Sequence, residues 1–224
     1  MKRTPEFKWL LVGALIPWLG GCATIHKSAD AGDLEKVDQL LAKGVAVDAR
    51  DEFGRTPLMW AAEDLDVVRH LADRGADIDA RDANGETALM KAAFVGSLDV
   101  VRYLVERGAD VNALSATGRT PLMRAAGNLD VVKFLVAQGA AVDARDANGD
   151  TALRWAATFG ALGVVKFLVR QGADANAPDN RGQTPLGWAR AYGHDDVVDY
   201  LQQKRENASV GNDEGKLPRQ NAAT

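Results

Sequence analysis

The chain has 224 residues, and its 27 Lys and Arg residues against 31 Asp and Glu residues give a formal net charge of −4. An acidic chain without a basic block is a poor nucleic-acid binder. One cysteine excludes an intramolecular disulfide, and three histidines leave little material for a zinc site. With 46% hydrophobic and 26% charged residues, the composition is that of a folded protein.

The beginning of the chain has the pattern of a secretory signal. Lys2, Arg3 and Lys8 form a basic start, and an apolar run over residues 9–19 follows it. This run is shorter than the roughly 20 residues that a membrane-spanning helix needs. We therefore predict a lipoprotein-type leader at residues 1–21 that is removed from the mature protein.

The apolar run ends in Leu19-Gly20-Gly21-Cys22, which resembles the lipobox of bacterial lipoproteins. In that family the leader is cut before the cysteine, whose sulfur carries a diacylglyceryl group and whose new amino group is acylated. The resemblance implies lipidation of Cys22, followed by a short tether to residue 24. Two or three acyl chains hold a protein stably on a membrane. The alternative is a soluble secreted protein with a cysteine at its signal boundary.

The resemblance also bears on location. The residue after the cysteine is Ala23, whereas Asp at that place retains many enterobacterial lipoproteins at the inner membrane. We therefore expect a lipid-anchored protein of the bacterial cell envelope, on the inner leaflet of the outer membrane and facing the periplasm. Loss of the leader removes three basic residues and one acidic residue, which takes the net charge from −4 to −6. Such a chain is not drawn to anionic headgroups, so the lipid alone would hold it to the membrane.

The body of the chain is a repeat array. A Thr-Pro-Leu or Thr-Ala-Leu string begins at Thr56, Thr87, Thr120, Thr151 and Thr184. The intervals alternate between 31 and 33 residues. These units resemble ankyrin repeats, which run about 33 residues. The resemblance implies an all-α ankyrin-repeat solenoid of about six helix-turn-helix units with short β-hairpin loops. The domain spans 25–204, with units 25–54, 55–85, 86–118, 119–149, 150–182 and 183–204.

Local signals in each unit agree with two short helices. The opening Thr can cap the first helix, and Pro suits the first helical position. Leu98, Val101, Leu104 and Val105 form a stripe that would bury one face of a second helix. A glycine then ends each second helix. After Lys204 the apolar period stops, and we predict a disordered tail at 205–224.

Two departures from the ankyrin pattern stand out. Residues 56–119 align with residues 120–183 without a gap, and every other unit lacks two residues between its helices. We therefore predict clipped inter-helix loops in units 55–85 and 119–149. The family usually has a histidine after Thr-Pro-Leu that ties adjacent units. That place is taken here by Met59, Met90, Met123, Arg154 and Gly187, so we expect the polar tie to be lost throughout.

Nothing in the sequence meets the needs of catalysis, and we predict neither an enzyme nor a cofactor. His26, His70 and His194 lie in different units, without a nucleophile or metal ligands beside them. His70 stands where other units hold an aromatic ring, which indicates a packing position. Residues 143–150 look superficially like a calcium loop, but they lack the alternating acids and the bidentate Glu. They match the hairpin turn of the repeat instead.

A row of large side chains occupies one repeat position, four residues after each opening Thr. In ankyrin proteins this position lies on the first helix, faces the concave groove and often contacts partners. The row comprises Trp60, Lys91, Arg124, Trp155 and Trp188. We call these five residues the inner row. Further aromatic candidates on the groove or hairpins are Phe53, Phe94, Phe159 and Tyr192, and hairpin tips add Glu52, Arg55, Glu86, Arg119, Asp150 and Arg181.

Aromatic and Arg residues are the usual hot spots of protein interfaces. The inner row therefore predicts a protein-binding surface, although the rings could instead pack on neighbouring helices or stack on cations. In contrast, we interpret Tyr103, Phe134, Phe167 and Tyr200 on the second helices as structural.

Together these features indicate a monomeric, non-catalytic interaction module that is held at a membrane and binds an unidentified protein. Two other roles remain open. One is an immunity protein against a periplasm-delivered toxin such as a lipase, for which lipid anchoring and an acidic binding face are suited. The other is an accessory factor for a stress-response or envelope enzyme.

Overall fold

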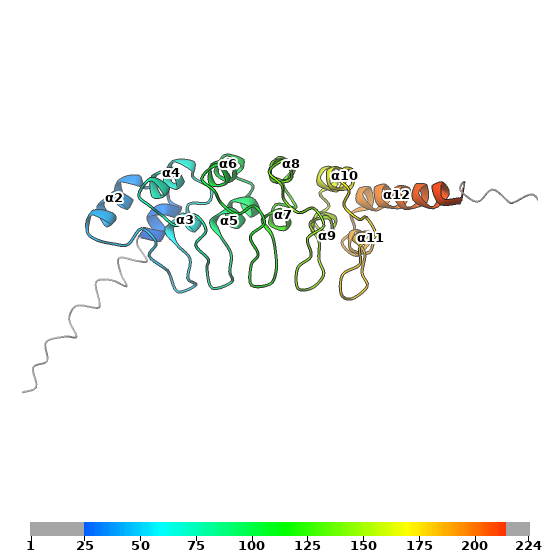
Figure 1. Ribbon diagram of the computed structural model, residues 1–224, viewed down its shortest axis with the longest axis horizontal. Helices are drawn as coiled ribbons and strands as arrows, with labels where there is room; N and C mark the ends of the chain where they lie inside the picture. The colour runs from blue at the N-terminus through cyan, green and yellow to red at the C-terminus, as the bar shows by residue number, and fades with distance from the viewer. Residues whose placement is uncertain (1–24, 214–224) are drawn as a thin grey trace, which may run out of the picture.

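The computed structural model describes residues 25–213, with side chains to residue 206. The helices stack side by side into an elongated array (Figure 1). They are α2 (Leu34–Ala42), α3 (Pro57–Trp60), α4 (Leu65–Asp73), α5 (Ala88–Val95), α6 (Leu98–Glu106), α7 (Pro121–Arg124), α8 (Leu129–Ala137), α9 (Ala152–Thr158), α10 (Leu162–Arg170), α11 (Pro185–Ala191) and α12 (Asp195–Asp213). A further helical segment over residues 25–30 precedes α2.

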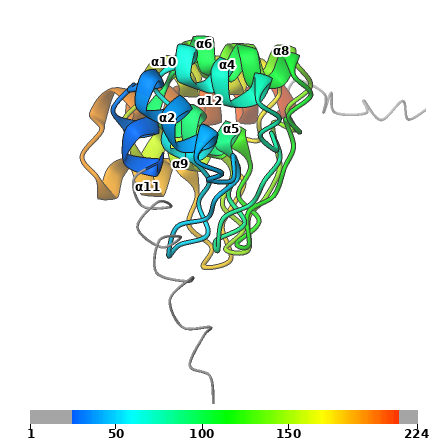
Figure 2. The same cartoon turned by 90° about the vertical axis from the view of Figure 1, so that its left-hand side faces the viewer.

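Two layers of helices and a fringe of loops make up the array. The second helices α4, α6, α8 and α10 form one layer, the first helices α3, α5, α7, α9 and α11 form the next, and the hairpin loops extend beyond the first helices (Figure 1). Viewed along the stack, the loops project in a common direction (Figure 2). The described residues contain no strand. The predicted all-α solenoid of helix-turn-helix units is therefore confirmed.

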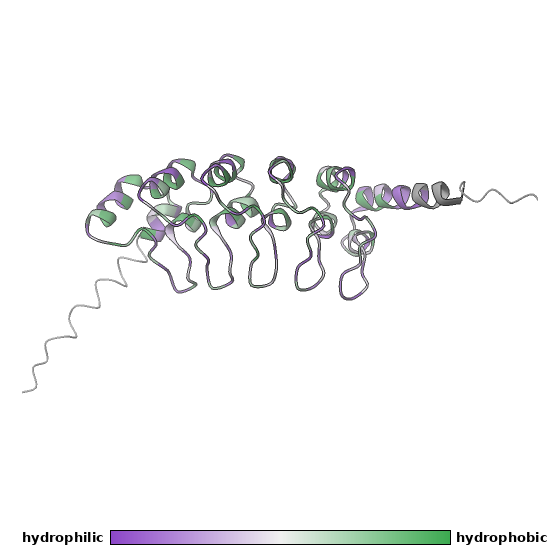
Figure 3. Ribbon diagram, viewed as in Figure 1, coloured by the Kyte–Doolittle hydropathy of each residue, from purple (hydrophilic) through white to green (hydrophobic). Residues whose placement is uncertain are grey.

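The core runs continuously along the array between the two layers. In the third unit, Val100, Val101 and Leu104 of α6 are at most 1% exposed, and the Ala92-Ala93 pair of α5 is fully buried. The same positions are buried in the neighbouring units, whereas the hairpin loops are mostly hydrophilic (Figure 3). Each fully buried Val or Leu contributes about 1.5–3 kcal/mol through apolar burial.

Helix ends follow the predicted signals with one exception. The hydroxyls of Thr87, Thr120, Thr151 and Thr184 each accept a hydrogen bond from a backbone N–H in the first turn. Thr56 makes no such bond, and its hydroxyl is buried without a partner. At the other end of the second helix, Gly108 has a φ of +95°, which an L side chain rarely adopts.

The two-residue deletion in alternate units shortens the first helix and not the loop, so the prediction of clipped inter-helix loops is wrong. Helices α3 and α7 have four residues each, whereas α5 has eight. Between α5 and α6 only residues 96 and 97 intervene, and Gly96 there adopts a left-handed conformation. A connection of two residues is too short to lose two residues and still join the helices. The deletion therefore removes the last turn of the first helix.

The end of the array also differs from expectation. Helix α12 continues to Asp213, so the structure gives residues 205–213 of the expected tail as helical. The segment 202–206 is Gln-Gln-Lys-Arg-Glu, and these residues are strong helix formers even without an apolar face. Residues 214–224 lie outside the described residues.

Adjacent units are tied by a polar ladder as well as by the core. Each hairpin donates one backbone hydrogen bond to the hairpin before it, as in Ala116 N–H to Asn84 O at 2.8 Å.

The expectation that the histidine tie is lost throughout is wrong for the first unit. His26 precedes Gly32 by the same six residues that separate Met90 from Gly96, which makes it the histidine of the ankyrin pattern. Its Nε2 atom lies 2.9 Å from each of two backbone oxygens in the loop that follows, those of Ala49 and Arg55.

Candidate functional site

The inner row lies on the first helices α3, α5, α7, α9 and α11, beside the hairpin loops. All five of its side chains are half-buried, so each is partly packed and partly accessible. The geometry around the row is repeated from unit to unit because each hairpin begins with the same kind of residue. That residue is Asp51, Asp82, Ser115, Asp146 or Asp179.

The first oxygen of this hairpin residue shapes the turn. Asp51 Oδ1 accepts hydrogen bonds from the backbone N–H groups of Phe53 and Arg55, both at 2.9 Å. The same pair of bonds recurs at Asp82, Asp146 and Asp179, and Ser115 makes the equivalent bonds through its hydroxyl. A short acceptor at this position therefore fixes the hairpin.

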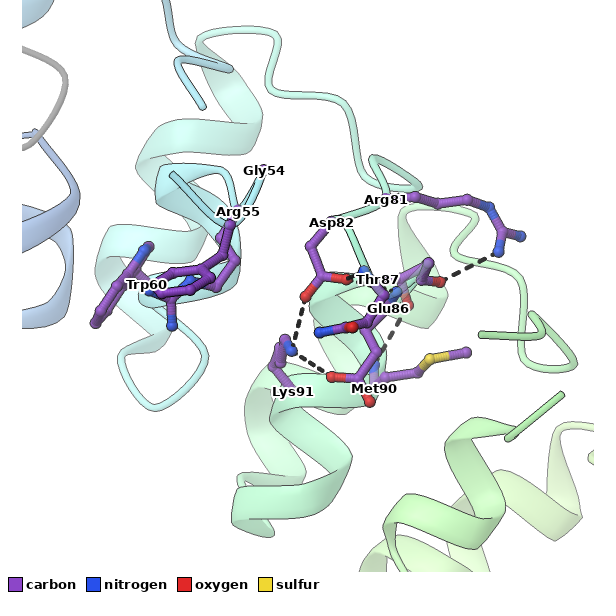
Figure 4. Close-up of polar contacts among 12 residues, drawn as sticks. Gly54, Arg55, Trp60, Arg81, Asp82, Glu86, Thr87, Met90 and Lys91 are labelled. Carbon is purple, nitrogen blue, oxygen red and sulfur yellow. Dashed lines mark hydrogen bonds and ion pairs between the residues drawn. The ribbon is translucent and has the colours of Figure 1, made fainter. Parts of the chain in front are cut away.

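The second oxygen of Asp51, Asp82 and Asp179 reaches the inner row. Asp51 Oδ2 accepts from the Trp60 indole at 3.1 Å and from Arg55 Nε at 2.8 Å. In the next unit Lys91 replaces the tryptophan and pairs with Asp82 Oδ2 at 2.9 Å (Figure 4). At Asp51, Asp82 and Asp179 one carboxylate thus couples the hairpin to the first helix that follows it.

These contacts favour the ionised carboxylates. Burial raises the pKa of Asp51, but hydrogen bonds from Arg55, Phe53 and the Trp60 indole outweigh it, and the net pKa lies below the ordinary value. The pKa of Asp82 is also lowered, because the ammonium of Lys91 and two backbone N–H groups overcome the effect of burial. The aspartates are therefore held as anions beneath the row.

The centre of the row is organised by Glu86. Its side chain is 8% exposed, and its two oxygens pair with Lys91 of its own unit and Arg124 of the next unit. Lys91 and Arg124 are more accessible, at 24% and 22%. The acids therefore lie beneath the cations, and the charge that a partner meets in the middle of the row is positive. The more accessible charged groups here are therefore cations, whereas an acidic binding face was expected.

The hairpin-tip candidates divide in the same way. Glu52 and Arg181 are exposed, and Arg55 and Arg119 are half-buried. In contrast, Glu86 and Asp150 are 6% and 1% exposed. The last two hold Lys91, Arg124 and Arg154 in place, so they support the row and are not hairpin tips that a partner can reach.

Guanidinium groups stack on the tryptophans. Arg55 lies 4.0 Å from the ring centroid of Trp60 (Figure 4). Arg154 lies between two units, 4.0 Å from the Trp155 centroid and 4.5 Å from the Trp188 centroid. Sequence reasoning treated position 154 only as a missing histidine and did not find this role. The sequence does contain a sign of this role, because Arg154 directly precedes one tryptophan of the row and faces the following unit, which carries another tryptophan of the row.

The further aromatic candidates are exposed along the same side of the first helices and hairpins. Phe53, Phe94, Phe159 and Tyr192 are 52%, 59%, 49% and 58% exposed. Phe159 and Tyr192 stack on the inner row, at centroid distances of 5.9 Å from Trp155 and 6.0 Å from Trp188. Phe94 lies one position earlier in the register than Phe159, and it contacts the guanidinium of Arg124 at 5.3 Å.

The aromatics of the second helices lie elsewhere. Tyr103, Phe134, Phe167 and Tyr200 pack against the core cluster and are half-buried, as a structural role requires. His70 occupies the equivalent position, and its Nε2 atom lies 2.8 Å from Asp38 Oδ1 in the preceding unit. The His70 interaction lowers the pKa of Asp38. His70 is thus an inter-unit tie as well as a packing residue.

The remaining chemical candidates serve the scaffold. His194 Nε2 lies 2.9 Å from the Thr158 carbonyl of the preceding unit. In the stretch that resembles a calcium loop, Asp146 shapes its hairpin and Asp143 accepts the N–H of Asp174 at 3.1 Å. Within the part of the chain that the structure describes, no group of three or more His, Cys, Asp or Glu residues is arranged to hold a metal ion. Cys22 lies outside the described residues.

None of the helices described over residues 25–213 is both long and apolar enough to cross a membrane. A comparison with curated proteins gave no match. The family model for ankyrin repeats in three copies matches residues 7–82, 25–115, 64–146 and 127–214. These overlapping matches cover the whole stack of units, and the fold of this family is typically a non-catalytic module for protein interaction. With both the repeat geometry and the family model in agreement, the chain belongs to the ankyrin-repeat family.

Proposed function

We propose that this protein is a lipid-anchored, periplasm-facing ankyrin-repeat lipoprotein that binds a protein partner through the inner row and the exposed aromatics beside it. The ankyrin fold supports protein binding in general terms. The lipobox of residues 19–22 is the basis for the anchor and for the location. The partner is held beside the membrane, and catalysis is left to it.

The observation that carries the proposal is the exposure of large rings on a rigid support. Phe94, Phe159 and Tyr192 are each about half exposed or more, although each contacts a residue of the inner row. Exposed rings that are already ordered lose little conformational entropy on binding, and they bury a large area. A row of such rings beside partly accessible cations has the composition of an interface core.

The anchor adds affinity without new contacts. A partner in the same compartment or membrane meets the row at a raised effective concentration, so a modest intrinsic affinity suffices. Toxin neutralisation and support of an envelope enzyme would both use this face, and the identity of the partner distinguishes them. A toxin encoded beside this gene would favour immunity, whereas a housekeeping enzyme there would favour the accessory role.

The proposal is tested with membrane fractions and a triple variant, Phe94→Ser with Phe159→Ser and Tyr192→Ser. The crosslinked complex is isolated through a tag on the full chain. The triple variant should lose the partner while its melting temperature stays close to that of the parent, because exposed positions contribute little to stability. Leu114→Ser, at an equally exposed apolar position, is the matched control and should retain the partner. Equal capture by all three proteins would refute the proposal.

A further inference from the structure

The fourth unit leaves a pocket in the middle of the inner row. Its first helix, α7, ends at Arg124 after four residues, whereas α5 and α9 on either side have eight and seven. The rings of Phe94 at the end of α5 and Phe159 just after α9 therefore stand on both sides of a missing helical turn. Between them lies a pocket of about 100 Å³. It is lined by Phe94, Arg119, Met123, Arg124, Trp155 and Phe159.

The size of the pocket restricts what it can hold. Ligand sites for drug-sized molecules and cofactors have volumes of about 300 Å³ or more. A volume near 100 Å³ matches instead one side chain of a docked polypeptide. The two flanking phenylalanines are 59% and 49% exposed, so they offer apolar surface to the residues on either side of that side chain.

Three buried N–H donors around the pocket make no hydrogen bond within the described chain. Arg119 Nε, Arg124 Nε and the indole Nε1 of Trp155 are buried atoms without a hydrogen bond. The tryptophans of two other units do have partners, since Trp60 and Trp188 donate to the aspartates of their hairpins. Buried donors without acceptors are costly, and they are stabilised when a ligand supplies the acceptor.

The acidic side chains near the pocket are buried, so an incoming ligand would contact the arginines before it contacts the acids. Glu86 pairs with Arg124 and Lys91, and its side chain is 8% exposed. Asp146 Oδ2 is buried at 3.5 Å from Arg119 Nε, and its other oxygen is used by the hairpin. The acids balance the formal charge from below. From above, the accessible groups are the guanidiniums of Arg119 and Arg124, whose side chains are 29% and 22% exposed and whose terminal nitrogens carry further N–H donors.

We propose that this pocket is the anchor subsite for an acidic side chain of the protein partner, with the carboxylate of an Asp or Glu bound by Arg119, Arg124 and Trp155 between Phe94 and Phe159. The inference rests on the proposed function, and it adds the chemistry of the partner. Charge-assisted hydrogen bonds from guanidinium to carboxylate are the strong and directional ones. Apolar or aromatic residues beside the acid would pack on the two phenylalanines.

The test uses a random peptide library displayed on phage and selected on the full chain in detergent. The selected peptides should carry an Asp or Glu next to an apolar residue. A synthetic copy of one selected peptide, with its acid replaced by the matching amide, should bind at least about tenfold more weakly, which is the scale of one hydrogen bond to a charged group. Because only the peptide changes in this comparison, the fold of the protein is not at issue.

The site is assigned with protein variants and with NMR. Arg119→Gln and Arg124→Gln should each weaken the acidic peptide by about tenfold or more. Arg102→Gln is the matched control, because Arg102 also stacks on an aromatic ring, that of Phe134, but lies on the second helix α6 outside the inner row. It should leave the affinity within about twofold. The acidic peptide should also shift the indole N–H resonance of Trp155 more than those of Trp60 and Trp188.

Each other outcome counts against a defined claim. Peptides that require the exposed aromatics but show no preference for acids would overturn the carboxylate subsite and leave the proposed function in place. A Trp155 resonance that does not respond to an acidic peptide would overturn the location of the subsite. Failure to enrich any peptide would count against both the subsite and the binding face.

Discussion

The indole N–H of Trp188 donates to Asp179 Oδ2 at 3.0 Å, and Trp60 and Asp51 repeat this pairing at 3.1 Å four units away. In both pairs the other carboxylate oxygen accepts the backbone N–H groups of the hairpin. A single side chain thus sets the turn and orients the ring on the next helix. The inner row is therefore built by the hairpins as much as by the helices that carry it.

This arrangement predicts a loss of stability in acid. The pKa values of Asp51, Asp82 and Asp179 lie below the ordinary value of 3.8 in the folded chain. Such groups stabilise the fold fully above the pKa of the unfolded chain, and the contribution is lost as the pH falls through the lower folded pKa. The free energy of unfolding, measured in urea, should therefore fall below about pH 4.

The comparison that tests this origin is Asp179→Asn. The variant should be less stable than the parent at pH 7, because an amide nitrogen can face the Trp188 indole and because the charge is lost. Its stability should also depend less on pH between about 2 and 4. An unchanged pH dependence would show that Asp179 does not contribute to it.

The caps offer a paired test of buried hydroxyls. Thr120 accepts the N–H of Met123 at 3.2 Å, whereas the equivalent hydroxyl of Thr56 is buried without a partner. Thr120→Val should cost about 1 kcal/mol in the free energy of unfolding, which is typical for the loss of a cap. Thr56→Val should be neutral or stabilising, because it removes an unpaired polar group of similar shape. Equal costs for the two changes would contradict the assigned geometry.

The histidine tie predicts local weakening of the first unit. His26→Ala removes a ring that bridges toward the second unit, and it should cost about 1–3 kcal/mol for the polar groups left unpaired. Hydrogen exchange should speed up in α2 and little in α8, since solenoids unfold from their ends. Lys27→Ala, at the exposed neighbouring position, should change neither. Uniform acceleration across the array would argue against a local tie.

Restoring the missing helical turn should close the central pocket. Residues 125–128 are replaced by the six-residue sequence of 92–97, which makes the fourth unit long. The control places the same six residues over 61–64 in the second unit. Both variants should fold, since long units already occur in the array, but only the first should lose the acidic peptide. Equal affinity in both variants would show that the pocket of the fourth unit is not used.

The anchor is tested at its single cysteine. Cys22→Ser should release the protein from the membrane fraction or leave it as the longer unprocessed form, because the sulfur that takes the lipid is gone. Electrophoretic mobility and fractionation measure both results. A variant that is still processed and still membrane-bound would contradict the lipobox interpretation.

Features that recur from unit to unit could be predicted from the sequence, whereas features without a period could not. The paired helices recur along the array, the buried Ala pairs recur in the units between residues 55 and 182, and all the opening threonines but Thr56 cap their helices, so the repeat predicted these features. The helical continuation of α12 through residues 205–213 carries no apolar period, and beyond Glu206 it contains Asn, Ser, Gly and Asp, which have low helix propensity. The missing turn of α7 was visible as two absent residues, but whether they came from a helix or a loop depends on the space between the layers.

The binding surface shows the same division. The alignment of the opening threonines placed Trp60, Trp155 and Trp188 in one row, and the structure does bring them to the same side of the array. The burial of Glu86 beneath Lys91 and Arg124 could not be obtained in this way, since Glu86 was assigned to a hairpin tip from its distance to a turn. Contacts between units depend on the pitch of the stack, which the spacing within a unit does not give.

The central claim is that a protein partner occupies the inner row, and site-specific photo-crosslinking in cells tests it most directly. Benzoylphenylalanine is placed at Phe159 beside the row, and in a second strain at Lys133 on the opposite layer, where the side chain is 50% exposed. A single crosslinked protein from position 159 and none from position 133 is the predicted result. Crosslinking from 133 alone, or from neither position, would contradict the account.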